Sequence, residues 1–379
     1  MIFRVVQGAG GGMLLPIGQL MMADAAGPKR MGRVMSIVAV PAMLAPILGP
    51  AVGGFIVDNA SWRWIFYVNV PIGAIAIVAA LRILPRVAPG EAERLDFRGL
   101  LLLATGVPLL TYGLAEVGIS GSFTGARVVL PCVAGLALIA LFARHALRVP
   151  RPLLNLRPYR RATFASASFA MFCLGAALFG SMILLPLYWQ GVRHESVVDT
   201  GLLTAPQGVG MALVLPIAGR LADRLGGGPV ALFGVCVTTI ATIPFALIGP
   251  ATPIGSLSAA MVVRGMGIGF SFMPAMTAAF CALERSELAD ATPQMNVLQR
   301  VGGSIGTAVL AVVLQRALSD ANSLEAAADA YGTAFWGAAA LTALAIVPCV
   351  ILTRAERAAR PTPEERDAQS DSVVQAIAA

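Results

Sequence analysis

The sequence predicts an all-α protein that crosses a membrane many times. Of its 379 residues, 57% are hydrophobic and 12% are charged, and the mean hydropathy is +0.79. A soluble domain carries about 25% charged residues, so this chain has too little polar surface to face water. About eleven apolar segments approach the roughly 20 residues that a spanning helix requires. These segments lie near residues 2–23, 34–57, 64–84, 98–116, 127–147, 163–188, 200–219, 228–249, 254–281, 292–315 and 332–353.

The basic residues are distributed unevenly among the connections between these segments. About twenty of the 27 Lys and Arg residues lie in alternate connections and in the stretch after residue 353, as the positive-inside rule requires of cytoplasmic loops. The opposite connections hold Arg63, Arg127, Arg193 and Arg316. We therefore expect a cytoplasmic C-terminus, and the net charge of +7 needs no nucleic acid as a partner. The polar stretch 354–379 is predicted to be a disordered cytoplasmic tail.

Patterns typical of enzymes and of cofactor sites are absent from the sequence. It contains no GxxxxGK[ST] phosphate loop, no HExxH and no GxSxG. The cysteines lie in or beside apolar segments and lack CxxC spacing, so we interpret them as packing residues: Cys132, Cys173, Cys236, Cys281 and Cys349. The sequence therefore predicts a protein that is not an enzyme and that uses no metal or other cofactor.

Gly-rich helices recur in the same order in two parts of the chain. The run at residues 8–12 is followed by one at 49–53, and the run at 265–269 by one at 302–306. About 255 residues separate the corresponding runs, as expected of a membrane bundle with duplicated halves. Glycines four residues apart let helices approach closely, and a proline can interrupt a membrane helix that has neighbours. The residues expected in these packing and helix-breaking roles are Gly49, Pro50, Gly53, Gly54, Gly265, Gly269, Gly302 and Gly306.

The stretch from Leu44 to Gly73, LAPILGPAVGGFIVDNASWRWIFYVNVPIG, carries a specific resemblance. Its first part resembles the fifth-helix signature of exporters in the major facilitator superfamily, and its continuation resembles the fourteen-helix drug:proton antiporters. The resemblance implies a bundle with two pseudo-symmetric halves and multidrug efflux, in which lipophilic or cationic compounds leave the cell in exchange for protons. It also implies the bacterial cytoplasmic membrane as the location, and a periplasmic adaptor as a partner in a Gram-negative cell.

The resemblance and the repeat together predict four regions. Residues 1–84 would form the remainder of an N-terminal bundle, with three helices, because the family has three helices before the one that starts here. Residues 163–353 would form the C-terminal bundle of six helices. Two helices within residues 98–147 are then left over, and we place them as an insertion between the halves. The fourth region is the tail, residues 354–379.

Two other functions are compatible with these patterns. An exporter of the same fold with narrow specificity, for one metabolite or antibiotic, would carry the same helices and glycines. A membrane remnant without transport activity is the other alternative, because three helices and the usual coupling carboxylate are missing. Carboxylates are almost absent from the interior of the apolar segments, whereas a proton-driven antiporter needs one that protonates within the protein.

The first apolar segment contains a group that resembles the fourth-helix motif of the family. Arg4 is followed there by Gln7 and Gly8. In the family this Arg is linked to proton coupling, and a buried Arg normally faces a cavity or an acidic partner. The alternative is an Arg near a helix end that reaches toward the membrane surface.

Residues 219–226, GRLADRLG, resemble the cytoplasmic gate motif of the family in its second-half copy. Asp223 precedes a helix that begins near Gly228, and a carboxylate there can meet the positive helix end and a neighbouring Arg such as Arg224. Such contacts can form in one conformation and break in the other. An ordinary capped turn with a solvated charge pair is the alternative, because the family's trailing basic residues are replaced by glycines.

Five further polar residues are candidates for a substrate path. Arg264 lies at membrane depth and is either an anchor at the outer interface or a ligand group. Asn296 and Gln299 precede Gly302 on one helix and are candidates to line a polar path, although hydrogen bonds between packed helices explain them equally well. Asp58 and Asp199 lie at outer helix ends, where they would attract cationic substrates.

Overall fold

The computed structural model describes residues 59–84, 95–150, 152–319 and 321–358, together with scattered residues between 7 and 56. This part of the chain is helical and contains no strand, which confirms the all-α prediction. Nine helical runs in it are long and apolar enough to cross a membrane, and they coincide with nine predicted segments. The segments predicted near 2–23 and 34–57 fall mostly outside the described residues, and Arg4, Pro50, Gly54 and Asp58 fall outside them entirely.

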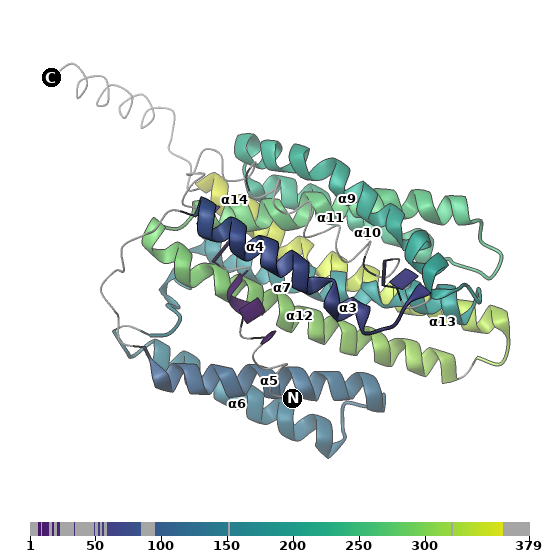
Figure 1. The fold of residues 1–379 in the computed structure, drawn as a ribbon, viewed down its shortest axis with the longest axis horizontal. Helices are drawn as coiled ribbons and strands as arrows, with labels where there is room; N and C mark the ends of the chain where they lie inside the picture. Colours follow the sequence, from purple (N-terminus) through teal and green to yellow (C-terminus); the bar gives the residue numbers. More distant parts are fainter. Residues whose placement is uncertain are drawn as a thin grey trace.

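From α7 onward the helices follow one another with short connections (Figure 1). Three of the nine membrane runs in the described residues consist of two helices in line, and each of the other six is a single helix. The described elements are α3 (Trp64–Tyr67), α4 (Asn69–Ile83), α5 (Phe97–Ser120), α6 (Ala126–Ala146), the 3-10 helix η2 (Arg157–Arg160), α7 (Ala162–Met182), α8 (Leu184–Gly191), α9 (Val197–Leu225), α10 (Gly227–Ala246), α11 (Ile254–Cys281), α12 (Arg285–Ser319), α13 (Leu324–Leu344) and α14 (Ile346–Ala358).

Three of the in-line breaks have the same cause in the sequence. In each case the first helix ends four residues before a proline. A proline has no N–H group, so the carbonyl of the residue four positions earlier loses its helical partner. The pairs of last helical residue and proline are Tyr67 and Pro71, Met182 and Pro186, and Leu344 and Pro348.

Helices α7 to α14 form one bundle with an apolar core (Figure 1). Within it α7 packs along α12, while α11 packs between α9 and α10. Large side chains such as Phe164 and Phe272 fill one part of the core, and Trp189 and Phe335 fill the other. The core thus involves every helix predicted for the region 163–353.

Glycines set the distance between α7 and α12. Cβ atoms added to Gly302 and Gly306 of α12 would overlap the backbone carbonyls of Phe172 and Ala176 on α7. Gly175 of α7 meets the backbone of α12 in the same way. The two helices therefore touch backbone to backbone, as small residues permit in a membrane, where lipid supplies no hydrophobic force to bring helices together.

The same device joins α9 and α11. Cβ atoms added to Gly265 would overlap the carbonyl of Gln207, and one added to Gly210 would overlap the carbonyl of Val262. Gly269 packs against Val214 one turn further along α11. By contrast, no atom lies within 4 Å of a Cβ built on Gly49 or Gly53, whose sequence neighbours are mostly outside the described residues.

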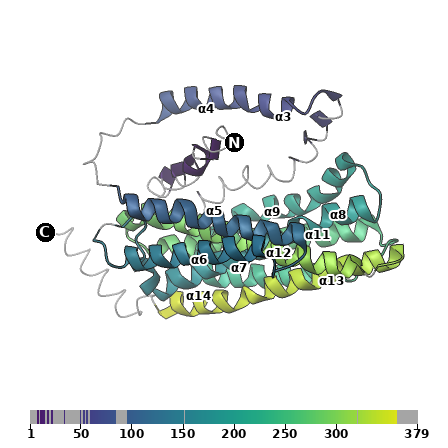
Figure 2. The same cartoon turned by 90° about the horizontal axis from the view of Figure 1, so that it is seen from below.

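Helices α5 and α6 form a hairpin at one edge of the bundle (Figures 1 and 2). The hairpin joins the bundle mainly through contacts between α5 and α12. A small apolar cluster of Val117, Val128, Ala308 and Val312 fills this junction. The pair therefore packs on the outside of the C-terminal bundle, and its placement as an insertion between halves stays a prediction.

Helices α3 and α4 run along the other described helices but stay apart from them (Figure 2). They contain no buried residue, although their 20-residue run is strongly apolar. Ile75 and Leu81, for example, are 69% and 78% exposed. An exposed helix that is apolar on every side is stable in lipid and not in water, so its character supports the membrane assignment without core contacts.

The last membrane run extends beyond the predicted end at residue 353. Helix α14 continues to Ala358, so the prediction of disorder is wrong for residues 354–358. The reason is Glu356, whose carboxylate accepts hydrogen bonds from the first amides of α10 and holds this turn against the bundle. The remainder of the tail lies outside the described residues.

Asp96 connects the hairpin to the loop that leads into the C-terminal bundle. Its carboxylate accepts hydrogen bonds from the Gly99 amide at 2.9 Å, the Leu153 amide at 3.1 Å and the His145 Nε2 at 2.9 Å. It therefore caps α5, ties the last turn of α6 to it, and fixes the chain after α6. Burial raises the pKa of the Asp96 carboxyl, but these hydrogen bonds outweigh it, and the pKa lies below the ordinary value.

Replacing Asp96 by Ala is expected to destabilise the hairpin by about 1–3 kcal/mol near neutral pH, because a helix cap and charge-assisted hydrogen bonds are lost. A depressed folded-state pKa contributes stability above the ordinary Asp pKa of about 3.9. That contribution disappears as pH falls through the folded-state value, so the difference between wild type and variant should shrink below about pH 4. Thermal unfolding in detergent at several pH values measures this, with Glu116→Gln on the same helix as control. A difference that persists unchanged in acid would contradict the assignment.

Candidate functional site

Arg264 lies inside the C-terminal bundle and not at its outer edge. Helix α11 begins at Ile254, and Arg264 stands well within it with only 2% of its surface exposed. The proposal that it anchors the helix at the outer interface is therefore wrong. Packing decides this, because the glycines around Arg264 bring α9 and α10 close to α11 and enclose the side chain.

Three other helices contribute partners to the Arg264 guanidinium. Its Nη1 donates to Oε1 of Gln207 on α9 at 2.6 Å, and its Nε donates to Oγ1 of Thr242 on α10 at 3.2 Å. Its Nη2 donates to the Ser181 hydroxyl of α7. We call these four residues the Arg264 cluster.

The two hydroxyls of the Arg264 cluster are oriented as acceptors. The Ser181 hydroxyl donates to the Ala177 carbonyl at 2.6 Å, and the Thr242 hydroxyl donates to the Thr238 carbonyl at 2.7 Å. Each hydroxyl has one proton, so its lone pairs are left for the guanidinium. The local helix geometry thus prepares both side chains to hold a cation.

The partners of Arg264 are neutral. The ion pairs between Asp96 and His145 and between Arg161 and Glu284 and Glu287 involve no residue of the Arg264 cluster. A charged residue at membrane depth costs roughly 2.5–3.5 kcal/mol on insertion scales and is usually functional. The cluster can therefore supply a fixed positive charge, stabilised by dipoles from three helices, inside this half of the protein.

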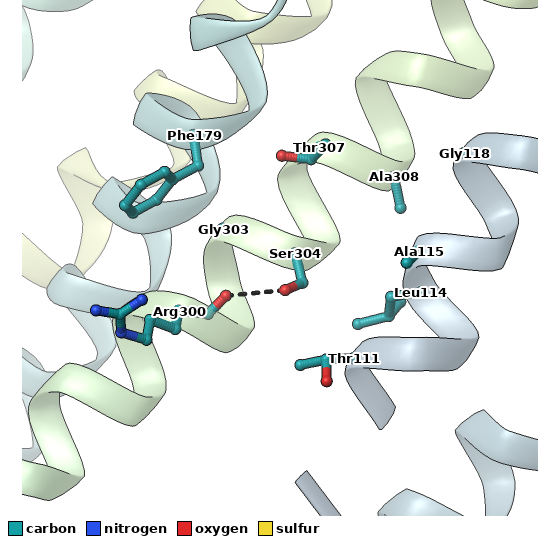
Figure 3. A pocket seen from close by; sticks show the side chains of 10 residues that line it. All are labelled: Thr111, Leu114, Ala115, Gly118, Phe179, Arg300, Gly303, Ser304, Thr307 and Ala308. Carbon is teal, nitrogen blue, oxygen red and sulfur yellow. Dashed lines mark hydrogen bonds between the residues drawn. The ribbon is translucent and has the colours of Figure 1, made fainter. Parts of the chain in front are cut away.

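A cavity of about 330 Å³ lies between α5, α7 and α12 (Figure 3). Thr111 and Leu114 line it from α5 and Phe179 from α7. Arg300 and Ser304 line it from α12, together with Thr307. The wall combines apolar and hydroxyl-bearing side chains with one guanidinium, a composition that suits a small amphipathic ligand.

A second cavity, of about 540 Å³, is also lined by Arg300. It brings Asn296 of α12 together with Gly8 of the first Gly-rich run, two residues that the sequence selected separately. Gln299 is half-buried and does not line either cavity; its backbone packs against Gly175 instead. Gln7 is placed beside Gly8 in a helical conformation.

Arg300 was not among the site candidates selected from the sequence. It is exposed on α12 and lines both cavities. The available signal was a basic residue in the middle of the apolar segment 292–315. The spacing of residues along one helix does not show which of them face a cavity, so the neighbouring polar residues Asn296 and Gln299 were chosen instead.

The cytoplasmic gate motif forms a tight turn between α9 and α10. Gly226 alone separates the two helices, with φ of +98°, a value that favours glycine. Asp223 and Arg224 are exposed in the last turn of α9. Asp223 also lines a cavity of about 290 Å³ together with Glu356 and Thr277.

The carboxylate at the positive end of α10 is that of Glu356. It accepts hydrogen bonds from the Gly227 amide at 3.1 Å and the Gly228 amide at 2.7 Å. The sequence had placed Asp223 near this helix end, and in the structure Asp223 lines the adjoining cavity together with Glu356. Glu356 was missed because it lies far along the chain, and only the packing of α14 beside α10 brings it here.

Replacing Glu356 by Gln is expected to lower stability by about 0.5–2 kcal/mol, because the negative charge at a helix N-terminus and part of the amide capping are lost. Thermal unfolding of the protein in detergent measures the change. Glu325→Gln, in the first turn of α13, is a control of the same chemistry at a helix whose cap is Ser323. Equal effects of the two substitutions would show that the Glu356 contacts do not stabilise the fold.

Asp199 lies at the exposed start of α9. Its carboxylate accepts the Ser196 hydroxyl at 2.6 Å, while its amide donates to the same hydroxyl oxygen at 3.1 Å. These contacts cap the helix. Asp199 is therefore engaged locally, and neither of the cavities lined by Arg300 includes it.

Comparison with known proteins places these features in a family. The model of the Major Facilitator Superfamily matches residues 1–307. The multidrug resistance protein B homolog of Mycobacterium tuberculosis is 40% identical over 316 residues, which cover 83% of this chain and 58% of that protein. The MFS-type transporter YcnB of Bacillus subtilis is 30% identical over 363 residues, covering 95% and 77%.

A third similar protein is the lincomycin resistance protein LmrB of Bacillus subtilis. It is 27% identical over 312 residues, which cover 82% of this chain and 65% of that protein. The chain thus spans less than two thirds of the length of both resistance proteins. Its similarity to each of them extends over most of its own length.

Proposed function

Because this chain belongs to the major facilitator superfamily, we propose that it acts as a secondary exporter that moves lipophilic compounds across the bacterial cytoplasmic membrane in exchange for protons. Two similar proteins are named for multidrug and lincomycin resistance, which supports export as the direction of transport. The loop charges support a cytoplasmic C-terminus.

The observation that carries the proposal is the Arg264 cluster. Replacing a buried charged group by an apolar side chain of similar size is often neutral or stabilising, so a buried guanidinium is weak evidence of a purely structural role. Here the charge is enclosed and held by three neutral side chains. Retention of such an expensive group supports a role in transport, where a fixed charge responds to a change of protonation or to a substrate.

The glycine contacts support movement of this half as a unit. The Arg264 cluster ties α7, α9 and α10 to α11, and backbone contacts at glycines join α7 to α12. In alternating access, one half of a transporter rocks largely as a rigid body against the other. The second cavity lies between α12 and the first Gly-rich run, where such a movement would change access.

Arg4, Gln7 and Gly8 are proposed to take part in proton coupling from the first Gly-rich run, as the family motif implies. Asp223 and Arg224 are proposed to take part in closing the cytoplasmic side, beside the helix end that Glu356 caps. Both assignments rest on the resemblance of the motifs. In the described part of the chain, the deep charges are arginines, so the group that carries the proton is left open.

Transport tests the proposal directly. The chain is expressed in bacteria that lack their own exporters, and accumulation of the neutral lipophilic dye Nile red is followed by fluorescence. Cells with the chain should accumulate less dye, and a protonophore should remove the difference. In everted vesicles, addition of dye should dissipate a preformed pH gradient. If the chain changes neither accumulation nor the gradient for any of several lipophilic compounds, the inactive-remnant interpretation holds.

A further inference from the structure

We propose that the cavity between α5, α7 and α12 binds amphipathic organic anions, with Arg300 holding the charged group and Phe179 and Leu114 holding the apolar body. This inference rests on the proposed export function and narrows its substrate class. It departs from the expectation of cationic substrates. The observations that carry it are the charge, the hydrogen-bond donors, the shape and the depth of the cavity.

The charge of the cavity is positive. Arg300 is the charged residue among its described lining side chains, and it also lines the second cavity. The ion pairs of Asp96 with His145 and of Arg161 with Glu284 and Glu287 do not involve Arg300. An unpaired guanidinium repels a cation and attracts an anion, and this attraction is stronger within a membrane than in water. A lipophilic cation would therefore be disfavoured here.

The hydrogen-bond donors of the cavity come mainly from the same residue. The Thr111 hydroxyl donates to the Val107 carbonyl at 3.0 Å, and the Ser304 hydroxyl donates to the Arg300 carbonyl at 3.1 Å. Figure 3 shows that the Ser304 hydroxyl turns to its own helix, while the Arg300 side chain extends toward the side of Phe179. The planar guanidinium fork matches a carboxylate or sulfonate with two parallel hydrogen bonds.

The remaining wall suits an aromatic body. Phe179 is 37% exposed, so one part of its ring is available. Leu114 and Ala115 contribute apolar surface from α5, opposite α7 (Figure 3). A volume of about 330 Å³ is at the small end of the range for ligand pockets, which is roughly 300–1,000 Å³. A compound with one or two rings and a single acidic group fits these dimensions.

The depth of Arg300 argues against a phospholipid headgroup as the anion. The membrane run of α12 extends over Asp290–Ser319. With a rise of 1.5 Å per residue, this run of 30 residues is about 45 Å long, and Arg300 lies roughly 7 Å from its midpoint. Arg300 therefore lies within a hydrocarbon core about 30 Å thick that is centred on the run. Phospholipid headgroups stay at the membrane surface. A lipophilic acid can reach the depth of Arg300 because the guanidinium compensates its negative charge there.

Two probes with the same ring system test the inference. The anionic probe is 8-anilinonaphthalene-1-sulfonate, and the neutral probe is N-phenyl-1-naphthylamine, which lacks the sulfonate. Binding to the full chain in phosphatidylcholine nanodiscs is measured by fluorescence, with empty nanodiscs subtracted. Arg300→Gln should lower the affinity for the anionic probe by about 10- to 100-fold, because hydrogen bonds to a charged group are lost. It should change the affinity for the neutral probe by no more than about twofold. Arg300→Lys keeps the charge but not the planar fork, so an intermediate affinity for the anionic probe is expected.

Arg316→Gln is the matched control, because it removes the same charge from an exposed position near the end of α12. It should change the affinity for neither probe. The inference is overturned if Arg300→Gln leaves the binding of the anionic probe unchanged, or if it weakens the binding of both probes equally. Should Arg300→Gln not fold, competition on the wild type decides: naphthalene-1-sulfonate should displace the bound anionic probe, and a naphthyl trimethylammonium cation of similar size should not.

These measurements need no ion gradient and no turnover. Failure of the export assays with intact binding selectivity would overturn the proposed function alone. Export of Nile red without charge-selective binding at Arg300 would overturn this inference alone. The two results are thus separable in one protein preparation.

Discussion

Replacement of Arg264 by Met is expected to reduce proton-coupled export by about tenfold or more while the protein still folds. Met has a similar length and fills the space of the aliphatic stem, and replacing a buried charged group by an apolar one is often neutral for stability. The Ser181 and Thr242 hydroxyls keep their backbone acceptors. Only the Gln207 amide loses a strong partner. Loss of the fixed charge, and not unfolding, should therefore dominate.

Initial rates of efflux from cells and thermal unfolding of the purified protein, measured on the same variants, separate the two effects. Arg264→Lys keeps the charge but offers a compact ammonium in place of the planar fork, so an intermediate rate is expected. Arg316→Met is the control, since Arg316 is exposed on α12. Wild-type export by Arg264→Met would remove the observation on which the proposed function depends.

Replacement of Gly265 by Ala is expected to destabilise the contact between α9 and α11. Helix propensity alone would favour Ala over Gly by about 1 kcal/mol. A methyl group at this position, however, would overlap the carbonyl of Gln207, a backbone atom that cannot turn aside. Overpacking of this kind costs typically about 1–3 kcal/mol, so packing outweighs propensity and the protein should be destabilised.

The same substitution should also disturb the Arg264 cluster, because Gln207 supplies both the carbonyl that is overlapped and the amide oxygen that accepts from Arg264. Gly255→Ala, on the same helix, is the matched control, since no atom lies within 4 Å of its added Cβ. It should leave the melting temperature unchanged or slightly higher. A Gly265→Ala protein that melts no lower than Gly255→Ala would show that α9 and α11 do not depend on this contact.

Much of the architecture was accessible from the sequence because a membrane imposes simple rules. Apolar runs of about 20 residues marked the spans, and nine of them recur in the structure. The proline positions explain where three runs divide into two helices. The glycine runs at 265–269 and 302–306 indicated close contacts, and GxxxG patterns need no knowledge of the partner helix to be found.

The candidate site was less accessible, because it depends on which helix faces which. Arg264 was found in the sequence but was left undecided between the interface and the interior. Arg300 was counted among the basic residues but not selected, and Glu356 was placed in a disordered tail. Each of these residues takes its role from a neighbour that is distant in the chain: Gln207 for Arg264, Phe179 for the Arg300 cavity, and Gly228 for Glu356.

The sequence alone therefore determined that this protein is a helical membrane protein of a duplicated bundle type, because the length, hydropathy and spacing of segments act locally along the chain. Tertiary structure alone decided which polar groups are functional candidates. In a bilayer the energy of an arginine depends on the dipoles and cavities around it, and these come from helices that no local pattern connects. The enclosure of Arg264 and the exposure of Arg300 are both results of helix packing.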